Sequence, residues 1–295
     1  MKKGKGFLQL MRPANIITSV ADVLAGIAIS GYLANSNFSQ NYIFPILLLI
    51  ISTIGLYGGG VVFNDVFDAE LDKIERPERP IPKGIISIKE ASFLGIILLA
   101  AGIIAAAMVS LLSGLLALSI AVASLTYDKW SKHNAFAGPL NMGLCRGLNL
   151  LLGISIIISS VYVWWFLAIV PVIYIAAITM VSRGEVHGGS KSILYAAALF
   201  YCLVICSILF LSRMEMIWWT ILFLLPFSWM IFSALIRAIR LPTPKNIGKA
   251  VKAGVIALIL MNASWAAAFG AITLAFLILL LLPVSLWLAK IFAVT

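Results

Sequence analysis

Long apolar blocks repeat along almost the whole chain, and they constrain its fold more than any other feature. From about residue 15 onward, roughly 20 apolar residues at a time alternate with short polar interruptions, and a helix needs about 20 residues to cross a bilayer. The candidate spans are 15–34, 42–63, 91–109, 112–126, 138–158, 162–181, 192–211, 216–236, 247–267 and 271–292. The fourth is short, and the last two could form one broken element. We therefore predict an all-α polytopic transmembrane bundle of nine or ten helices, in a single domain over residues 1–295.

The distribution of charge supports a membrane protein and indicates its orientation. Hydrophobic residues make up 62% of the chain and charged residues 11%, whereas soluble domains have about 45–50% and 25%. The net charge of +10 could suggest a nucleic-acid partner, but the cations lie in the connections that follow the even-numbered spans. The positive-inside rule places those connections in the cytoplasm. We expect a multi-pass protein of the cell inner (cytoplasmic) membrane that contacts membrane lipids and binds no nucleic acid. Its oligomeric state stays open.

Six of the eleven carboxylates fall within fourteen residues, Asp65 to Glu78, at the end of the second span. At about 100° per residue, four polar side chains share one helix face. They are Asn64, Asp65, Asp68 and Asp72. Like charges at this spacing destabilise a helix unless a cation lies among them, and hard oxygen ligands favour Mg²⁺, which keeps open positions for substrate phosphates. The alternative is a solvated acidic loop paired with Lys73, Arg76 and Arg79.

Three motifs at characteristic intervals resemble the UbiA prenyltransferase superfamily. They are Asn64-Asp65-x-x-Asp68-x-x-x-Asp72 with the loop Arg76 to Gly84, Arg12-Pro13-x-Asn15, and Tyr127-Asp128-x-x-x-Lys132. The resemblance implies about nine helices around a central cavity, with Mg²⁺ and a diphosphate at its cytoplasmic mouth. It also implies transfer of a prenyl group from a polyprenyl diphosphate to an aromatic or lipid acceptor inside the membrane.

The residues near the acidic motif receive roles on this basis. Arg76 and Arg79 follow it in a proline-stiffened loop and are expected to bind the diphosphate, the alternative being that they only determine topology. By resemblance, Lys132 meets the leaving diphosphate and Asp128 positions it. Tyr127 is one of several aromatic side chains that could shelter an allylic carbocation, although such residues more often serve packing.

Polar residues inside the spans are further candidates. An arginine within a span is costly and faces a cavity or a partner, so Arg146 is expected to contact substrate or site carboxylates, unless it bonds only to neighbouring helices. Asn141 lies in the same span. Asp22 forms a polar stripe with Asn15 and Ser19, and it either binds the acceptor or is a structural, hydrogen-bonded aspartate.

A second motif departs from the family pattern. Most relatives carry Asp-x-x-x-Asp after the sixth span, where this chain has Glu185 and Gly189. Glu185 is a candidate metal and substrate ligand, and Ser182 shares its face if the stretch is helical. The missing carboxylate puts a second Mg²⁺ in doubt, and the variant resembles the EboC-like branch of the superfamily. The alternative function is a non-catalytic component that binds or transports prenyl lipids.

Overall fold

The computed structural model describes residues 3–34, 42–134, 136–185 and 188–292, and these residues form helices and connections without a strand. The long helices are α2 (Pro13–Ser30), α3 (Phe44–Phe67), α5 (Ile88–Val109), α6 (Leu111–Lys129), α7 (Ala137–Ile154), α9 (Ile169–Ser182), α10 (Lys191–Leu211), α11 (Ile217–Arg240), α12 (Pro244–Ala268) and α13 (Ile272–Phe292). Short helices are α1 (Lys3–Met11), α4 (Ala69–Glu75) and α8 (Ile158–Trp164), with 3-10 turns η1 (Tyr32–Ala34), η2 (Ser131–His133), η3 (Trp165–Ala168) and η4 (Met214–Met216).

Within the described ranges, nine helical segments are long and apolar enough to cross a membrane. One of them combines α8, η3 and α9. The helix α7 is equally central but more polar, because it carries Asn141, Arg146 and Asn149. The prediction of an all-α transmembrane bundle with nine or ten helices is confirmed.

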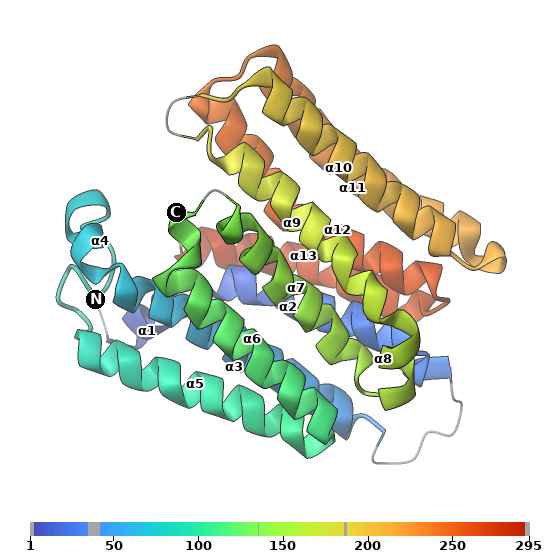
Figure 1. The fold of residues 1–295 in the computed structure, drawn as a ribbon, viewed down its shortest axis with the longest axis horizontal. Coiled ribbons are helices and arrows are strands. Elements are labelled where there is room, and N and C mark those ends of the chain that lie inside the picture. The colour runs from blue at the N-terminus through green and yellow to red at the C-terminus, as the bar shows by residue number, and fades with distance from the viewer. Residues whose placement is uncertain (1–2, 35–41, 135, 186–187, 293–295) are drawn as a thin grey trace.

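The bundle is built around α2 (Figure 1). This helix packs against α3, α7, α12 and α13, and 78% of its span is buried, compared with 17% for α13 at the periphery. On one side of α2 lie α3, α5 and α6, and on the other lie α9, α10, α11 and α12 (Figure 1). Polar groups on α2 are therefore shielded from lipid by other helices.

Glycines allow the two central helices to touch. A Cβ atom on Gly153 of α7 would lie 2.2 Å from the carbonyl oxygen of Val23, and one on Gly26 of α2 would lie 2.3 Å from that of Leu150. Lipid tails are as apolar as leucine, so helices in a bilayer associate mainly through such close packing. The pair of glycines sets the distance between α2 and α7.

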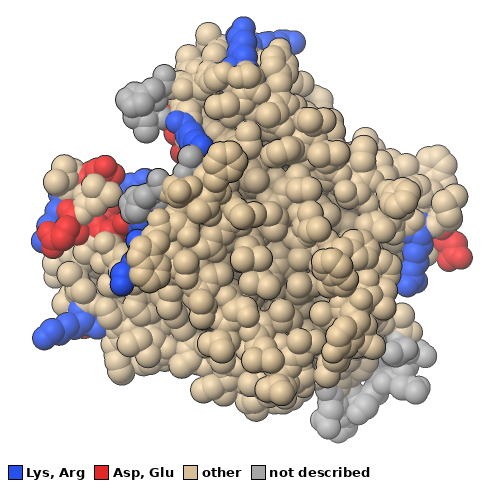
Figure 2. All heavy atoms as spheres, in the orientation of Figure 1, with Lys and Arg blue, Asp and Glu red and all other residues tan. Residues whose placement is uncertain are grey.

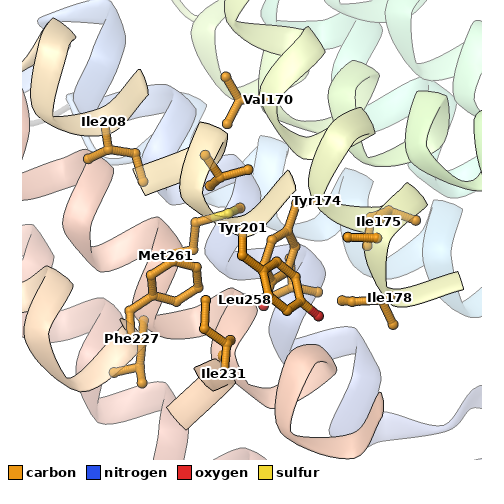
Figure 3. Packing of buried hydrophobic residues seen from close by; sticks show 14 of the residues in the cluster. Val170, Tyr174, Ile175, Ile178, Tyr201, Ile208, Phe227, Ile231, Leu258 and Met261 are labelled. Atoms are coloured by element: carbon orange, nitrogen blue, oxygen red, sulfur yellow. The ribbon is translucent and has the colours of Figure 1, made fainter. Parts of the chain in front are cut away.

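A second packing centre joins α9, α10, α11 and α12. The ring of Tyr174 packs at a tilt against those of Tyr201 and Phe227, with Met261 beside them (Figure 3). The buried hydroxyl of Tyr174 donates a hydrogen bond to the carbonyl oxygen of Gly254 at 2.8 Å. This partner removes the cost of burying a phenol among apolar side chains.

The outer surface matches a membrane setting. Figure 2 shows a broad surface without charge, and most Lys, Arg, Asp and Glu residues gather at the left and the top, where α4 and the α11–α12 connection lie in Figure 1. A smaller charged patch lies at the right (Figure 2). The charges thus concentrate at one end of the bundle, as the sequence predicts.

Replacement of Gly153 by alanine should destabilise the protein. The added methyl group meets a backbone carbonyl that cannot move without shifting α2, and overpacking of this kind costs about 1–3 kcal/mol. Thermal unfolding in detergent, followed by tryptophan fluorescence, should show a lower midpoint for Gly153→Ala. Gly4→Ala is the matched control, since nothing lies within 4 Å of its Cβ position. Equal midpoints for the two variants would contradict the close approach.

Candidate active site

A cavity of about 250 Å³ opens between α2, α3, α6 and α7. Its lining comprises Arg12, Asn15, Ser19, Thr53, Leu56, Tyr57, Gly60, Val61, Asn64, Ile120, Ser124, Tyr127, Asp128, Met142, Cys145, Arg146 and Asn149. Polar side chains from segments far apart in the sequence therefore meet around one space, and apolar side chains fill the wall between them.

The acidic motif lies where α3 ends and α4 begins. The long helix stops at Phe67, and Asp68 adopts a turn conformation before α4 resumes at Ala69. Helical hydrogen bonding nevertheless continues, because the amide of Asp68 donates to Asn64 and the amide of Asp72 donates to Asp68. The shared face expected from the spacing is therefore preserved across the break. Glu70 points elsewhere and pairs with Lys73 on the exposed surface.

Two arginines neutralise the buried carboxylates of this motif. Nη1 of Arg79 lies 3.1 Å from Asp65 and 2.7 Å from Asp72, so one guanidinium serves both. Nη2 of Arg12 donates to the same Asp65 oxygen at 2.6 Å. Asp65, Asp72 and Arg79 are each at most 8% exposed, where charges are stable only when paired. The like charges that would break the helix are thus compensated.

The remaining polar groups of the motif bond to the end of α6. The amide of Asn64 donates to Asp128 at 3.0 Å, and the ammonium of Lys132 in η2 pairs with Asp68. Tyr127 lines the cavity one residue before Asp128. Two motifs whose bonded residues lie 64 positions apart in the sequence therefore form one polar cluster at the cavity.

Deeper in the bundle, Asp22 is the centre of a buried network. Its Oδ2 atom accepts from Nη1 of Arg146 at 2.8 Å and from Asn149 at 3.2 Å. Its Oδ1 atom accepts from Asn262 of α12 at 2.7 Å. Arg146 also donates to Thr18 at 2.7 Å. Asp22 is only 1% exposed, so these contacts satisfy both carboxylate oxygens and bind α2, α7 and α12 together.

Arg146 has a second environment beside this network. Its guanidinium carbon lies 5.2 Å from the centre of the Tyr57 ring, and both residues line the cavity. The sequence left open whether Arg146 contacts a site carboxylate or bonds to neighbouring helices. In the structure it bonds to neighbouring helices at Asp22 and Thr18, and it also borders the cavity.

Of the expected site residues, Asn15, Asn64, Tyr127, Asp128 and Arg146 line the cavity, and Asp22, Asp65, Asp68 and Lys132 pair directly with lining residues or with partners of them, whereas Asn141, Ser182 and Glu185 lie apart from this cluster. The amide of Asn141 donates to Ser131 at 3.2 Å, and the hydroxyl of Ser182 donates to Thr179 in its own helix at 2.9 Å. Glu185 lies in a turn after α9, which ends at Ser182, so the helical relation that the sequence considered for Ser182, Glu185 and Gly189 does not hold. Partial burial raises the pKa of Glu185, and the positive charge of Arg76 opposes that rise. Arg76 is itself exposed and forms no ion pair within the described part of the chain.

Sequence reasoning gave no role to several residues that complete the site. Arg12 was noted only as part of a motif, yet it is the one non-glycine residue with positive φ (50°) among those described. The sequence feature that could have indicated a role for Arg12 is its position directly before the proline that begins α2. Asn149 follows Arg146 by one helical turn, and its spacing could have placed it on the same face. Asn262 is an isolated amide in an apolar helix, and no local pattern indicates that its partner is Asp22.

Comparison with known proteins identifies the family. The model of the UbiA prenyltransferase family matches residues 23–256. The chain belongs to the UbiA prenyltransferase family. It is 34% identical over 157 residues to the digeranylgeranylglyceryl phosphate synthase of Methanococcoides burtonii, covering 50% of this chain and 54% of that protein. For the protein of the same name from Sulfurisphaera tokodaii, identity is 31% over 199 residues, covering 64% and 68%.

The same fold occurs in solved UbiA structures. The structure of a UbiA homolog from Archaeoglobus fulgidus bound to GPP and Mg²⁺ has a TM-score of 0.60 and 16% identity, and the match covers 91% of this chain and 99% of that one. At this identity the likeness shows the shared fold. The chain spans about half to two thirds of the length of the curated relatives that it matches.

The Asp22 network generates a prediction about stability. Asp22→Ala leaves the Arg146 charge buried without its carboxylate, and breaking a buried ion pair costs about 3–5 kcal/mol. The double variant Asp22→Ala/Arg146→Leu removes both charges and should lose less than the sum of the two single variants. Thermal or denaturant unfolding of all four proteins in detergent measures this coupling. Additive losses would show that the two side chains do not depend on each other.

Proposed function

We propose that this UbiA-family protein transfers a prenyl group from a polyprenyl diphosphate to an acceptor inside the membrane. The observation that carries this proposal is the cluster in which Asp65 and Asp72 share Arg79 and Asp68 pairs with Lys132, joined to the cavity through Arg12, which pairs with Asp65 and lines the space. The cations can exchange their carboxylate partners for diphosphate oxygens, and the cavity can receive the beginning of the prenyl chain. A solvated acidic loop, which is the alternative interpretation of this motif, would not require a cavity beside it.

The acidic motif offers donor atoms of the type that Mg²⁺ prefers, while no three carboxylates in the described part of the chain are already arranged around one ion position. Asn64, Asp65, Asp68 and Asp72 offer only hard oxygen ligands, and Asp65 and Asp72 are close enough to share one guanidinium nitrogen. When bound, Mg²⁺ would neutralise diphosphate charge and act as a Lewis acid toward the leaving group. The Archaeoglobus fulgidus homolog with bound GPP and Mg²⁺ supports this cofactor.

The residues of the site then have separate roles in the reaction. Arg79, Lys132 and Arg12 stabilise the charge that builds on the diphosphate as the allylic C–O bond breaks and its electron pair stays with the leaving group. Asp128, bonded to Asn64, positions that amide. The Tyr57 and Tyr127 rings line the space in which the allylic cation forms, where an aromatic face stabilises positive charge. An acceptor hydroxyl oxygen forms the new bond to carbon and loses its proton to solvent.

We propose an acceptor of the glycerophosphate class, in line with the name of the curated relatives, digeranylgeranylglyceryl phosphate synthase. Its phosphate requires a cation, and Arg146 and Arg12 both line the cavity with the amides of Asn15 and Asn149. Arg146 and Asn149 already bond to Asp22, and Arg12 pairs with Asp65, so an acceptor phosphate would share these donors with the two carboxylates. In this assignment Asp22 serves acceptor binding indirectly, because it orients Arg146.

The proposal also covers the orientation of the protein in the membrane, its branch of the superfamily and the role of the second motif. We place the cavity mouth on the cytoplasmic side of the cytoplasmic membrane, because positively charged connections share its end of the bundle. We also assign the chain to the EboC-like branch, on the Ser182 to Val186 sequence that its members share. Glu185 is then a peripheral group that acts through its charge, Asn141 supports η2 through Ser131, and Ser182 supports the last turn of α9.

Asp65→Asn and Asp68→Asn should each lower Mg²⁺-dependent diphosphate release by about 10²–10³-fold, since each removes a charged ligand from the site. The control is Glu70→Gln, which removes one charge from the same loop at an exposed position. Release from an allylic diphosphate and a glycerophosphate acceptor is measured with purified protein in detergent. Full activity of both aspartate variants would overturn the site, and tight lipid binding without turnover in the wild type would favour a carrier.

The second motif is tested separately by Glu185→Gln. If this carboxylate takes part in metal or diphosphate binding, the Mg²⁺ concentration for half-maximal release should rise several-fold, while the maximal rate changes less. The reason is that Glu185 lies outside the cavity lining and can influence the mouth only through its charge. A Mg²⁺ titration indistinguishable from that of the wild type would assign the chemistry to the first motif alone.

A further inference from the structure

A second and larger cavity, of about 590 Å³, lies between α11, α12 and α13. Pro226, Trp229, Met230, Ser233, Ala234, Arg237, Asn246, Lys249, Ala253, Leu260, Leu279 and Leu282 line it. None of these residues borders the candidate active site. The groove therefore needs an explanation separate from prenyl transfer.

The lining changes character along the groove. On α11 the residues Trp229, Ser233 and Arg237 follow one another at about one helical turn, and on α12 Ala253 lies about one turn and Leu260 about three turns after Lys249. Each helix thus presents a cation at one end of the groove and apolar or small side chains along the rest. Arg237 lies in the last turn of α11 and Lys249 near the beginning of α12, so both cations are close in sequence to the α11–α12 connection (Figure 1).

Cations outnumber carboxylates at this end, where the nearest carboxylate is Glu185, whose Oε1 atom lies 3.7 Å from the Cβ position of Gly248. No Asp or Glu occurs after Glu215, whereas the same segment contains six Lys and Arg residues. Arg237 and Lys249 form no ion pair within the described residues. The side chain of Asn246 is already engaged, since it donates to the carbonyl oxygen of Leu241 at 2.9 Å. The topmost charged patch in Figure 2 accordingly shows blue without adjacent red.

We propose that this groove binds one anionic phospholipid of the surrounding membrane. Its phosphate lies between Arg237 and Lys249, and one acyl chain lies along Trp229, Met230 and the leucines of α12 and α13. Basic pockets between transmembrane helices on the side of the positive connections are suited to anionic headgroups, and each nearby cation adds to the attraction. Inorganic phosphate would leave the apolar length of the groove empty, and a zwitterionic lipid would leave the excess positive charge unneutralised.

The lipid has a structural consequence at this position. α11 and α13 contact α12 along the groove, and an acyl chain there fills volume that would otherwise lack packing partners. The headgroup also bridges the last turn of α11 to the first turns of α12. Bound lipid should therefore stabilise the α11–α12 pair independently of any reaction in the other cavity.

The test compares two double variants of equal charge. Arg237→Gln/Lys249→Gln removes the cations of the groove, and Arg240→Gln/Lys245→Gln removes two cations of the same connection that do not line it. Each protein is delipidated and titrated with dioleoyl phosphatidylglycerol or dioleoyl phosphatidylcholine, and bound lipid is counted by native mass spectrometry. We expect one phosphatidylglycerol on the wild type and on the control pair, and about tenfold weaker binding to the groove pair. Equal loss in both pairs, or equal retention of phosphatidylcholine, would overturn the proposal.

A second measurement locates the acyl chain. Phosphatidylglycerol with brominated chains should quench part of the tryptophan fluorescence of the wild type by contact with Trp229. The variant Trp229→Phe keeps the groove apolar and should lose that quenched component while still binding the lipid. Unchanged quenching in Trp229→Phe would place the chain outside the groove and refute the proposed site.

Discussion

The buried carboxylate of Asp22 is the constraint on which the centre of this protein depends. An ionised group deep in an apolar bundle is stable only when opposite charge and hydrogen-bond donors surround it. Arg146 and Asn149 on α7 and Asn262 on α12 supply them. Because these donors must reach a single side chain, three helices hold fixed positions relative to one another. The glycine contact between α2 and α7 is compatible with this arrangement, since it brings Arg146 within reach.

Buried carboxylates are also paired with positive charge at the mouth of the first cavity, and there the pairing has an additional effect. Arg79 lies between two carboxylates that would otherwise repel each other, and Arg12 adds a second positive charge to Asp65. The acidic cluster is thus held together by side chains that a diphosphate can also bind. A site of this kind keeps its shape without substrate and still has donors to exchange when a phosphate arrives.

The sequence was informative where the physical cause is local. Apolar blocks of bilayer length predicted the helices, and the spacing from Asn64 to Asp72 predicted one polar face, which hydrogen bonding preserves across the break at Asp68. Prediction failed where the cause is distant or depends on a helix end. Asn262 meets Asp22 across 240 residues. The end of α9 at Ser182 removed the helical relation between Glu185 and Gly189, and two glycines in that stretch weaken a helix.

Arg12 combines two properties that usually belong to different residues. Its backbone adopts a left-handed conformation that glycine would accept more readily, and its guanidinium neutralises Asp65. Glycine at this position would relieve the backbone but abandon the carboxylate, whereas lysine would keep the charge and lose the planar fork. Few substitutions at position 12 would therefore keep both the backbone conformation and the positive charge beside Asp65. The joint between α1 and α2 cannot be optimised for stability without changing the electrostatics of the cavity mouth.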